Sequence, residues 1–108
     1  MAKPTQIQAP DLRALMTTAR EAYLDDRNLE CVEKSMEAFV ELLRRQPDFL
    51  AGGPFAGNNR RVFPQLGVRL IGADTPTPAV EYDRRAFSNP EAITWFEYVS
   101  DCIVAAKL

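Results

Sequence analysis

The sequence predicts a mainly helical α+β fold, in which an N-terminal helical hairpin packs against a C-terminal helix. Two stretches near the N-terminus repeat apolar residues with helical periodicity, and a third stretch, with a clear start signal, lies at the C-terminus. Between them, a segment rich in Gly and Pro is irregular and has room for a small β-hairpin. Helices packed around one core, with the irregular segment as a cap, follow from this order.

The N-terminal hairpin is predicted from two apolar stripes that differ in phase. The first stripe covers residues 10–24, but continuing its periodicity would bury Asp26 and Glu30. A second helix is therefore expected over residues 28–45, ending before Pro47, and Asp26 or Asn28 is its expected N-cap. The two stripes consist of Leu12, Leu15, Met16, Ala19, Ala22 and Tyr23, and of Leu29, Val32, Met36, Phe39, Val40 and Leu43.

Charged side chains of the second helix suit its dipole, because acids occupy its early turns and two arginines its last turn. We expect Glu30 to pair with Lys34, and Glu37 or Glu41 to pair with the arginines. Such pairs are solvated and contribute only about 0.2 to 1 kcal/mol each. They indicate no function by themselves.

The C-terminal helix is predicted over residues 88–108. Ser88 or Asn89 provides the N-cap, and Pro90 fits the first helical position. Glu91 completes a capping box with Ser88. A wide apolar arc is expected to enter the core, and it consists of Ala92, Trp95, Phe96, Tyr98, Val99, Cys102, Ile103 and Ala106.

A second apolar patch on the same helix consists of Ile93 and Val104. A surface helix needs only one apolar stripe, so we expect this helix to contact two surfaces. The aromatic residues Trp95, Phe96 and Tyr98 are expected in the core, with a contact to an oligomer or partner as the alternative.

Residues 47–87 differ in composition from the rest, because all five glycines and five of the eight prolines lie there. Short strands are predicted at residues 66–71 and at residues 80–82, with a turn between them. A segment of this length without long elements is uncommon in a compact domain and often carries function. A functional site is therefore sought in this segment.

A single domain is expected for a chain of 108 residues. It divides into a polar leader (1–9), the helical hairpin (10–46), the irregular segment (47–87) and the C-terminal helix (88–108). The net charge of −2 argues against nucleic-acid binding, which normally requires an excess of Lys and Arg. Because neither a secretory signal nor a run of about 18 apolar residues is seen, we expect a cytoplasmic protein without membrane contact.

Histidine is absent, which excludes Ser-His-Asp, Cys-His and His-based zinc chemistry. Cys31 and Cys102 are expected to be reduced structural thiols, since a single pair of distant cysteines is no disulfide framework. We expect no cofactor and no catalytic residues.

The candidate site lies in the middle segment, where arginines and aromatic residues alternate. The closely spaced glycines of the loop from Gly52 to Arg61 allow backbone N–H groups to face an anion, although the loop matches no phosphate-binding motif. Arginine is also the favoured charged anchor at protein interfaces. The candidate partner- or anion-binding residues are Arg60, Arg61, Arg69, Arg84, Arg85, Phe55, Asn58 and Asn59.

These observations favour a non-catalytic accessory protein, adaptor or inhibitor of the immunity type that binds a larger protein partner. The same features would fit a homodimer. The alternative is a small anionic-ligand-binding protein or minimal enzyme that uses the 52–61 loop together with Arg84 and Arg85. Convergence of these arginines in one pocket would favour that alternative.

Overall fold

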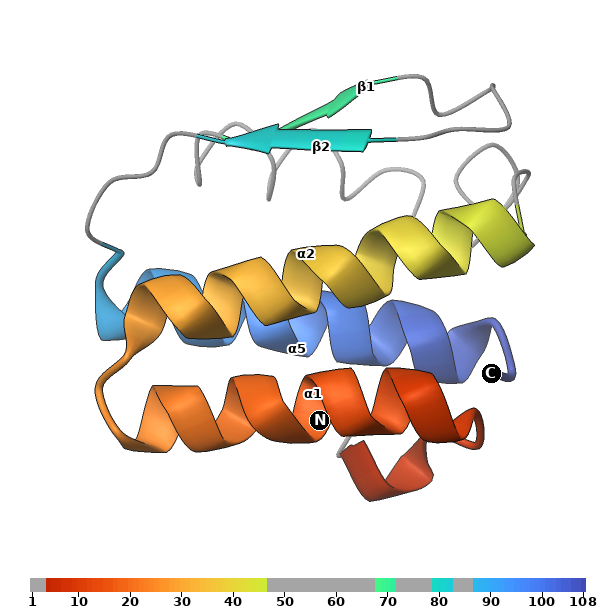
Figure 1. The fold of residues 1–108 in the computed structure, drawn as a ribbon, viewed down its shortest axis with the longest axis horizontal. Helices are drawn as coiled ribbons and strands as arrows, with labels where there is room; N and C mark the ends of the chain where they lie inside the picture. The colour runs from red at the N-terminus through yellow and green to blue at the C-terminus, as the bar shows by residue number, and fades with distance from the viewer. Residues whose placement is uncertain (1–3, 47–67, 72–78, 83–86) are drawn as a thin grey trace.

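The computed structural model describes residues 4–46, 68–71, 79–82 and 87–108, with the backbone alone at 68–71 and 79–82. Along the chain these residues form a short 3-10 helix η1 (Pro4–Gln6), helices α1 (Pro10–Leu24) and α2 (Asn28–Arg45), strands β1 (Val68–Ile71) and β2 (Ala79–Tyr82), and helix α5 (Asn89–Ala105). The helices lie side by side, and the two strands lie over α2 (Figure 1). The described part is therefore mainly helical.

The helical hairpin has the bounds that the sequence predicts, residues 10–24 and 28–45. The predicted N-cap of α2 is wrong, because Arg27 takes that position and neither it nor Asn28 makes a side-chain cap. The turn instead completes the C-terminus of α1. Asp26 adopts a left-handed φ of 61°, and the Arg27 N–H donates to the Ala22 carbonyl, as in a Schellman motif.

Helix α5 begins with the predicted capping box. The Ser88 Oγ accepts from the Glu91 N–H at 3.3 Å, and the Glu91 Oε1 accepts from the Ser88 N–H at 3.1 Å. The helix ends at Ala105, before the predicted residue 108. Lys107 adopts a φ of 61° and the Leu108 N–H donates to the Ile103 carbonyl, so α5 also ends in a Schellman motif, without the glycine that usually signals one.

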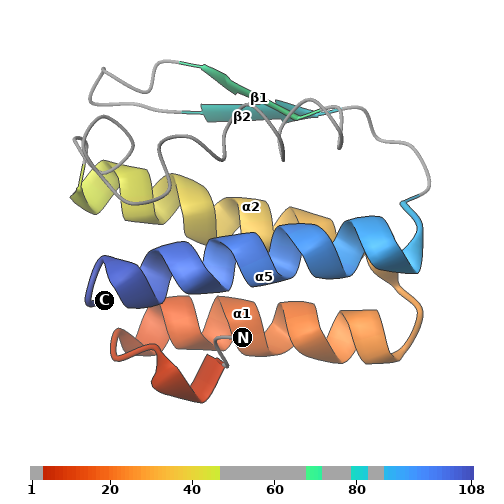
Figure 2. The same ribbon diagram turned by 180° about the vertical axis from the view of Figure 1, so that it is seen from behind.

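Helix α5 runs parallel to α2 and antiparallel to α1 (Figures 1 and 2). Two side-chain hydrogen bonds fix this alignment at the ends of α2. The Asn28 Nδ2 donates to the carbonyl of Phe87, just before α5, at 2.9 Å, and the Gln46 Nε2 donates to the Ala106 carbonyl, just after α5, at 2.9 Å. The Asn28 Oδ1, the atom that a helix cap would use as acceptor, is buried and has no hydrogen-bond partner among the described residues.

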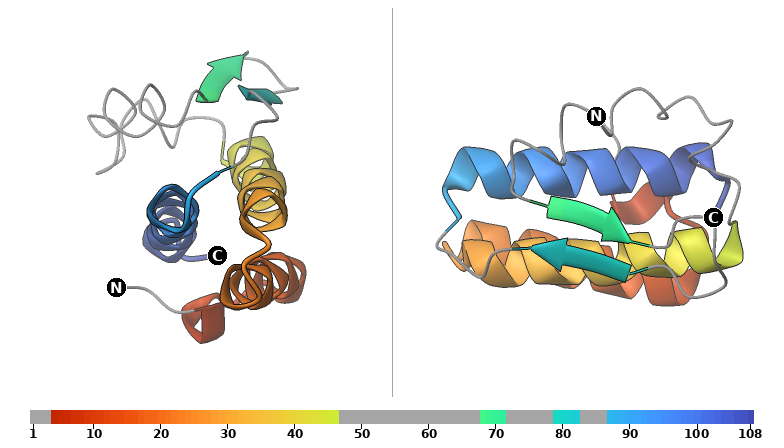
Figure 3. Two further views of the ribbon diagram at one scale, coloured as in Figure 1. Left: turned by 90° about the vertical axis from the view of Figure 1, so that its left-hand side faces the viewer. Right: turned by 90° about the horizontal axis from the view of Figure 1, so that it is seen from above.

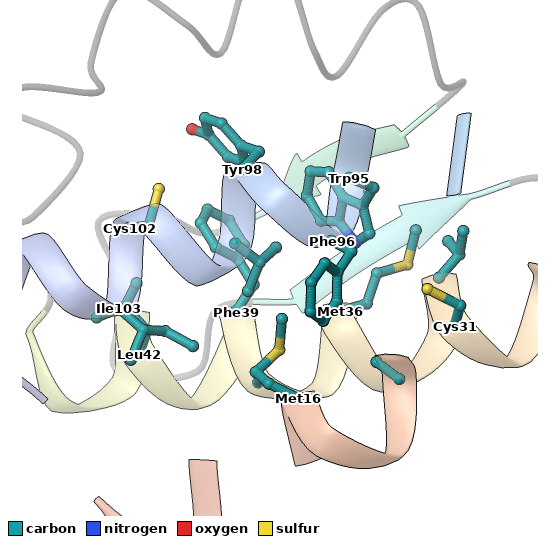
Figure 4. Packing of buried hydrophobic residues seen from close by; sticks show 14 of the residues in the cluster. Met16, Cys31, Met36, Phe39, Leu42, Trp95, Phe96, Tyr98, Cys102 and Ile103 are labelled. Carbon is teal, nitrogen blue, oxygen red and sulfur yellow. The ribbon is translucent and has the colours of Figure 1, made fainter. Parts of the chain in front are cut away.

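The core lies between the three helices (Figure 4). Phe39 of α2 packs edge-on against Trp95 of α5, with ring centroids 5.5 Å apart, and Trp95 stacks on Tyr98 at 5.7 Å. Burial of Trp95, Phe96 and Tyr98 confirms that they belong to the core. Each such ring removes about 150–250 Å² from water, which makes this cluster a main source of stability.

Helix α2 is buried over a wider arc than its sequence stripe predicts. Cys31, Ala38 and Leu42, which lie outside the predicted stripe, have no exposed surface, whereas Leu29 and Val40 of the stripe are half-buried. The reason is that α2 packs against both α1 and α5, and the end-on view shows the three helices in a triangular arrangement (Figure 3). On α5 itself, the second apolar patch of Ile93 and Val104 packs partly buried against the same core.

The leader contributes to the core through Ile7, which is fully buried and which the sequence analysis does not place there. The backbone N–H groups of Gln8 and Ala9 both donate to the Leu108 carbonyl at 2.6 Å. In addition, the Arg13 Nε donates to the Ile7 carbonyl at 2.7 Å. Residues 7–9 are thus held against the end of α5.

Strands β1 and β2 pair in antiparallel orientation, with Val68 opposite Tyr82 and Ile71 opposite Ala79. Their bounds, residues 68–71 and 79–82, lie close to the predicted strands at 66–71 and 80–82. The connection between them and the remainder of residues 47–87 lie outside the described residues, so the irregular segment and the hairpin turn stay predictions.

Candidate functional site

The sequence-predicted site lies almost wholly outside the described residues. This applies to the loop of residues 52–61 and to Arg60, Arg61, Arg84, Arg85, Phe55, Asn58 and Asn59. Arg69 lies in β1, where its Cα is paired with that of Glu81 in β2. The partner- or anion-binding role of these residues, and the convergence of the arginines, therefore stay predictions.

Within the described residues, an open groove of about 580 Å³ crosses α1 and α2. Its apolar lining consists of Leu15 from α1 and of Met36 and Val40 from α2. Met36 is only 4% exposed, whereas Leu15 and Val40 are half-buried. Leu15 packs against the core from its edge, and both side chains keep part of their apolar surface in contact with solvent. We refer to this feature as the α1/α2 groove.

Carboxylates line the rim of the α1/α2 groove. Asp11 comes from the first turn of α1, and Glu33, Glu37 and Glu41 come from α2, together with Arg44, the one cation among the described lining residues. Residues four apart lie on one face of a helix and are separated by about 6 Å along its axis. The three glutamates therefore form a row with one carboxylate per helical turn, which we call the glutamate row.

Ion pairs tie the rim to the C-terminal turn of α2. The Arg45 guanidinium hydrogen-bonds to the Asp11 carboxylate and to Glu41 at 3.2 Å, and Arg44 pairs with Glu41 at 3.0 Å. The hydrogen bond from Arg45 lowers the pKa of the Asp11 carboxyl from its usual 3.8. Since Asp11 and Arg44 are well exposed to solvent, these pairs orient the rim side chains but contribute little to the stability of the fold.

The remaining charged pairs of α2 differ from those expected. Lys34 pairs with Glu37 at 3.6 Å, while Glu30 pairs with Arg27 in the preceding turn. The expected pair of Glu30 with Lys34 is therefore wrong. The reason is that Arg27, at the N-cap, lies three residues before Glu30 on the same face, which frees Lys34 for the glutamate row.

The two thiols are unsuited to nucleophilic chemistry, as predicted. Cys31 and Cys102 are free and fully buried. Burial raises the pKa of Cys31 to about 11 and that of Cys102 to about 12, so both remain protonated at neutral pH. Burial likewise raises the pKa of Tyr98, the neighbour of Cys102 one turn earlier on α5. Cys31, Cys102 and Tyr98 therefore contribute to the packing of the core.

The α1/α2 groove was not identified from the sequence. The sequence pattern places its apolar lining in the core stripes and its glutamates on solvated surface. The one local signal for the groove is the glutamate row immediately beside Val40, a stripe residue that is half-buried. Periodicity alone cannot tell which residues at the edge of a stripe stay accessible, because that depends on how the neighbouring helix packs.

Comparisons with protein-family models, curated proteins and solved structures found no significant match. Within the described ranges, no helix is long and apolar enough to cross a membrane. Among the same residues, no group of three or more Cys, Asp and Glu side chains is placed to hold a metal ion.

Proposed function

We propose that this protein is a non-catalytic accessory, adaptor or immunity-type inhibitor protein, and that it binds a larger protein partner through the α1/α2 groove. The observation that supports the proposal is the combination of accessible apolar side chains and a rim of carboxylates in one open groove of about 580 Å³. An apolar centre with a polar rim is the usual anatomy of a protein interface.

The shape of the groove favours a protein segment over a small ligand. Sites for small molecules are concave and enclose most of the ligand surface. The α1/α2 groove is instead largely open to solvent, with Leu15 and Val40 half-buried along it. Helix pairs commonly accept a third helical segment in such a groove.

The arginines at residues 60–61 and 84–85 form a second proposed contact with the partner. Support comes from the enrichment of arginine in the energetically dominant positions of interfaces. This contact does not depend on the α1/α2 groove, and the two surfaces are tested separately.

The test is site-specific photo-cross-linking in cells of the native host. A photoreactive residue replaces Arg44, on the rim of the groove, or Arg20, an exposed arginine of α1 outside the groove lining. We expect one protein to be cross-linked from position 44 and not from position 20. The adduct should disappear with Val40→Gln and persist with Thr17→Gln, an exposed control on α1.

Identical adducts at both positions, or none at position 44, would contradict binding at the groove. If the adduct from position 44 survives Val40→Gln but is lost with Arg60→Glu/Arg61→Glu, the contact belongs to the middle segment and the protein-binding function stands. Circular dichroism verifies that every variant is folded before cross-linking is compared.

A further inference from the structure

The charge of the α1/α2 groove indicates what kind of segment it would bind, if the proposed function holds. Of the charged side chains that line it among the described residues, four are carboxylates and one is a guanidinium. We infer that the groove binds an amphipathic helix of the partner whose apolar face is flanked by lysine or arginine. This inference rests on the proposed function and adds the chemistry of the partner.

The spacing of the glutamate row matches such a helix. Glu33, Glu37 and Glu41 recur once per turn, so basic residues at the same four-residue interval on a helix alongside α2 would each face a carboxylate. The lining of α2 runs from Glu33 to Arg44, a length of about 16 Å or three helical turns. A partner segment of about eleven residues would fill this length.

The apolar lining gives the same helix a place to bury side chains. Val40 and Leu15 lie on facing helices and are half-buried, with the nearly buried Met36 between the glutamates of α2. Side chains of a third helix fit the channel between two packed helices, because ridges of one helix enter grooves of its neighbours. Methionine adapts readily to the shape of an incoming side chain.

The existing ion pairs of the rim would not prevent binding. Glu37 pairs with Lys34, and Glu41 pairs with Arg44 and Arg45; the side chains of these pairs are between 28% and 59% exposed. Exposed pairs of this kind contribute little and exchange readily. A basic residue of the partner can therefore share or replace these contacts at small cost, while the apolar contacts supply most of the affinity.

Other occupants fit the groove less well. A second copy of this chain, placed groove against groove, would bring one Glu37 against another, which costs free energy when the carboxylates are desolvated together. An anionic ligand would face the same repulsion. A metal ion would need converging ligands, and the described residues contain no group of three placed for one.

The experiment measures binding of a synthetic three-turn peptide with leucine on one face and lysine along both edges. Its counterpart has the same leucine face with glutamate in place of lysine. We expect the lysine peptide to bind the full-length protein, to shift the backbone amide NMR signals of α2 around the glutamate row, and to bind less tightly as salt is added. The glutamate peptide should not bind.

Two triple variants with equal loss of charge separate a specific site from general acidity. Glu33→Gln/Glu37→Gln/Glu41→Gln should weaken binding of the lysine peptide by about tenfold, the combined effect of three exposed ion pairs. Glu21→Gln/Asp25→Asn/Asp26→Asn removes three exposed carboxylates outside the groove lining and should leave the affinity within about twofold. Equal losses in both variants, binding of the glutamate peptide, or no binding of the lysine peptide would overturn the inference.

The cross-linking experiment separates failure of this inference from failure of the proposed function. A cross-linked partner that is lost with Val40→Gln but retained with the triple glutamine variant of the glutamate row would leave the proposed function intact and show that the partner segment is not cationic. Self-adducts from position 44 would identify a second copy as the occupant and would also overturn the cationic helix.

Discussion

Two buried serines provide a direct test of how hydrogen bonding contributes to this core. Ser35 of α2 and Ser100 of α5 have no exposed surface. The Ser35 Oγ donates to the Cys31 carbonyl at 2.8 Å, whereas the Ser100 Oγ has no hydrogen-bond partner among the described residues. We therefore expect Ser100→Ala to raise the free energy of unfolding and Ser35→Ala to lower it or leave it unchanged.

The magnitudes follow from the state of each hydroxyl. A buried polar group without a partner costs about 1–3 kcal/mol, so its removal at Ser100 should raise the free energy of unfolding by that amount. Loss of the hydrogen bond at Ser35 costs about 0.5–1.5 kcal/mol, partly offset by the higher helix propensity of alanine. Both serines lie inside helices, so the propensity gain is similar and cancels in the comparison. The two variants should differ by about 1.5–4.5 kcal/mol.

Urea unfolding followed by far-ultraviolet circular dichroism measures this difference, with equal m-values as the condition for comparison. Thermal unfolding provides a second measurement, because 1 kcal/mol corresponds to a shift in Tm of about 4–8 °C in a domain of this size. Equal destabilisation by both variants would refute the reasoning, since it would mean that the Ser100 hydroxyl has a partner in the folded protein.

Three further predictions concern stability. Lys107→Gly should raise the free energy of unfolding by about 0.5–1 kcal/mol, because glycine adopts the left-handed φ of 61° without steric cost. Asp26→Gly should raise the free energy of unfolding by less, because Asp tolerates this region better than Lys. Ile7→Ala should lower the free energy of unfolding by about 2–5 kcal/mol, since Ile7 is fully buried. Urea unfolding measures the effect of all three substitutions. The free energy of unfolding should be level between about pH 6 and 9 and fall between about pH 9 and 11, by up to about 1.4 kcal/mol per pH unit for each thiol, because the folded state retains the protons of Cys31 and Cys102 beyond the usual pKa of 9.0.

Each of these predictions has a contrary outcome. A loss of stability in Lys107→Gly would mean that the residue contributes contacts beyond its backbone conformation. An effect of Ile7→Ala below about 0.5 kcal/mol would mean that the leader is not packed on the core. In the double variant Cys31→Ala/Cys102→Ala, the free energy of unfolding should stay nearly constant up to about pH 10. If it falls as in the wild type, groups other than the two thiols cause the pH dependence.

The helices could be predicted from the sequence because their signals are local. The phase change between the two N-terminal stripes locates the turn, and Ser88 with Glu91 locates the start of α5. The end of α5 was harder to predict, because Lys107 takes a position where glycine is the usual signal. The hydrogen bond from the Asn28 Nδ2 to the Phe87 carbonyl joins residues that are distant in the sequence, so local sequence patterns cannot predict it.

The candidate site was predictable only in part. Charge patterning shows the glutamate row, but the α1/α2 groove exists because Leu15 of α1 lies opposite Val40 of α2, which requires the packed hairpin. Burial of Ile7 escaped prediction for the same reason, since a lone apolar residue in a polar leader has no periodicity. The arginines singled out in the middle segment lie outside the described residues, apart from the backbone of Arg69.

The parallel course of α2 and α5 sets a minimum length for the chain that joins them. Gln46 lies at one end of the helix pair and Phe87 at the other, so the connection must return along the 18 residues of α2, about 27 Å. About nine extended residues would reach this far, and a flexible Gly/Ser chain of about 25 residues has a matching average span. A connection much shorter than the native one would therefore be long enough to join the three helices. Replacing residues 47–86 with such a spacer should yield a minimal bundle in which binding by the helices is measured apart from binding by the insert.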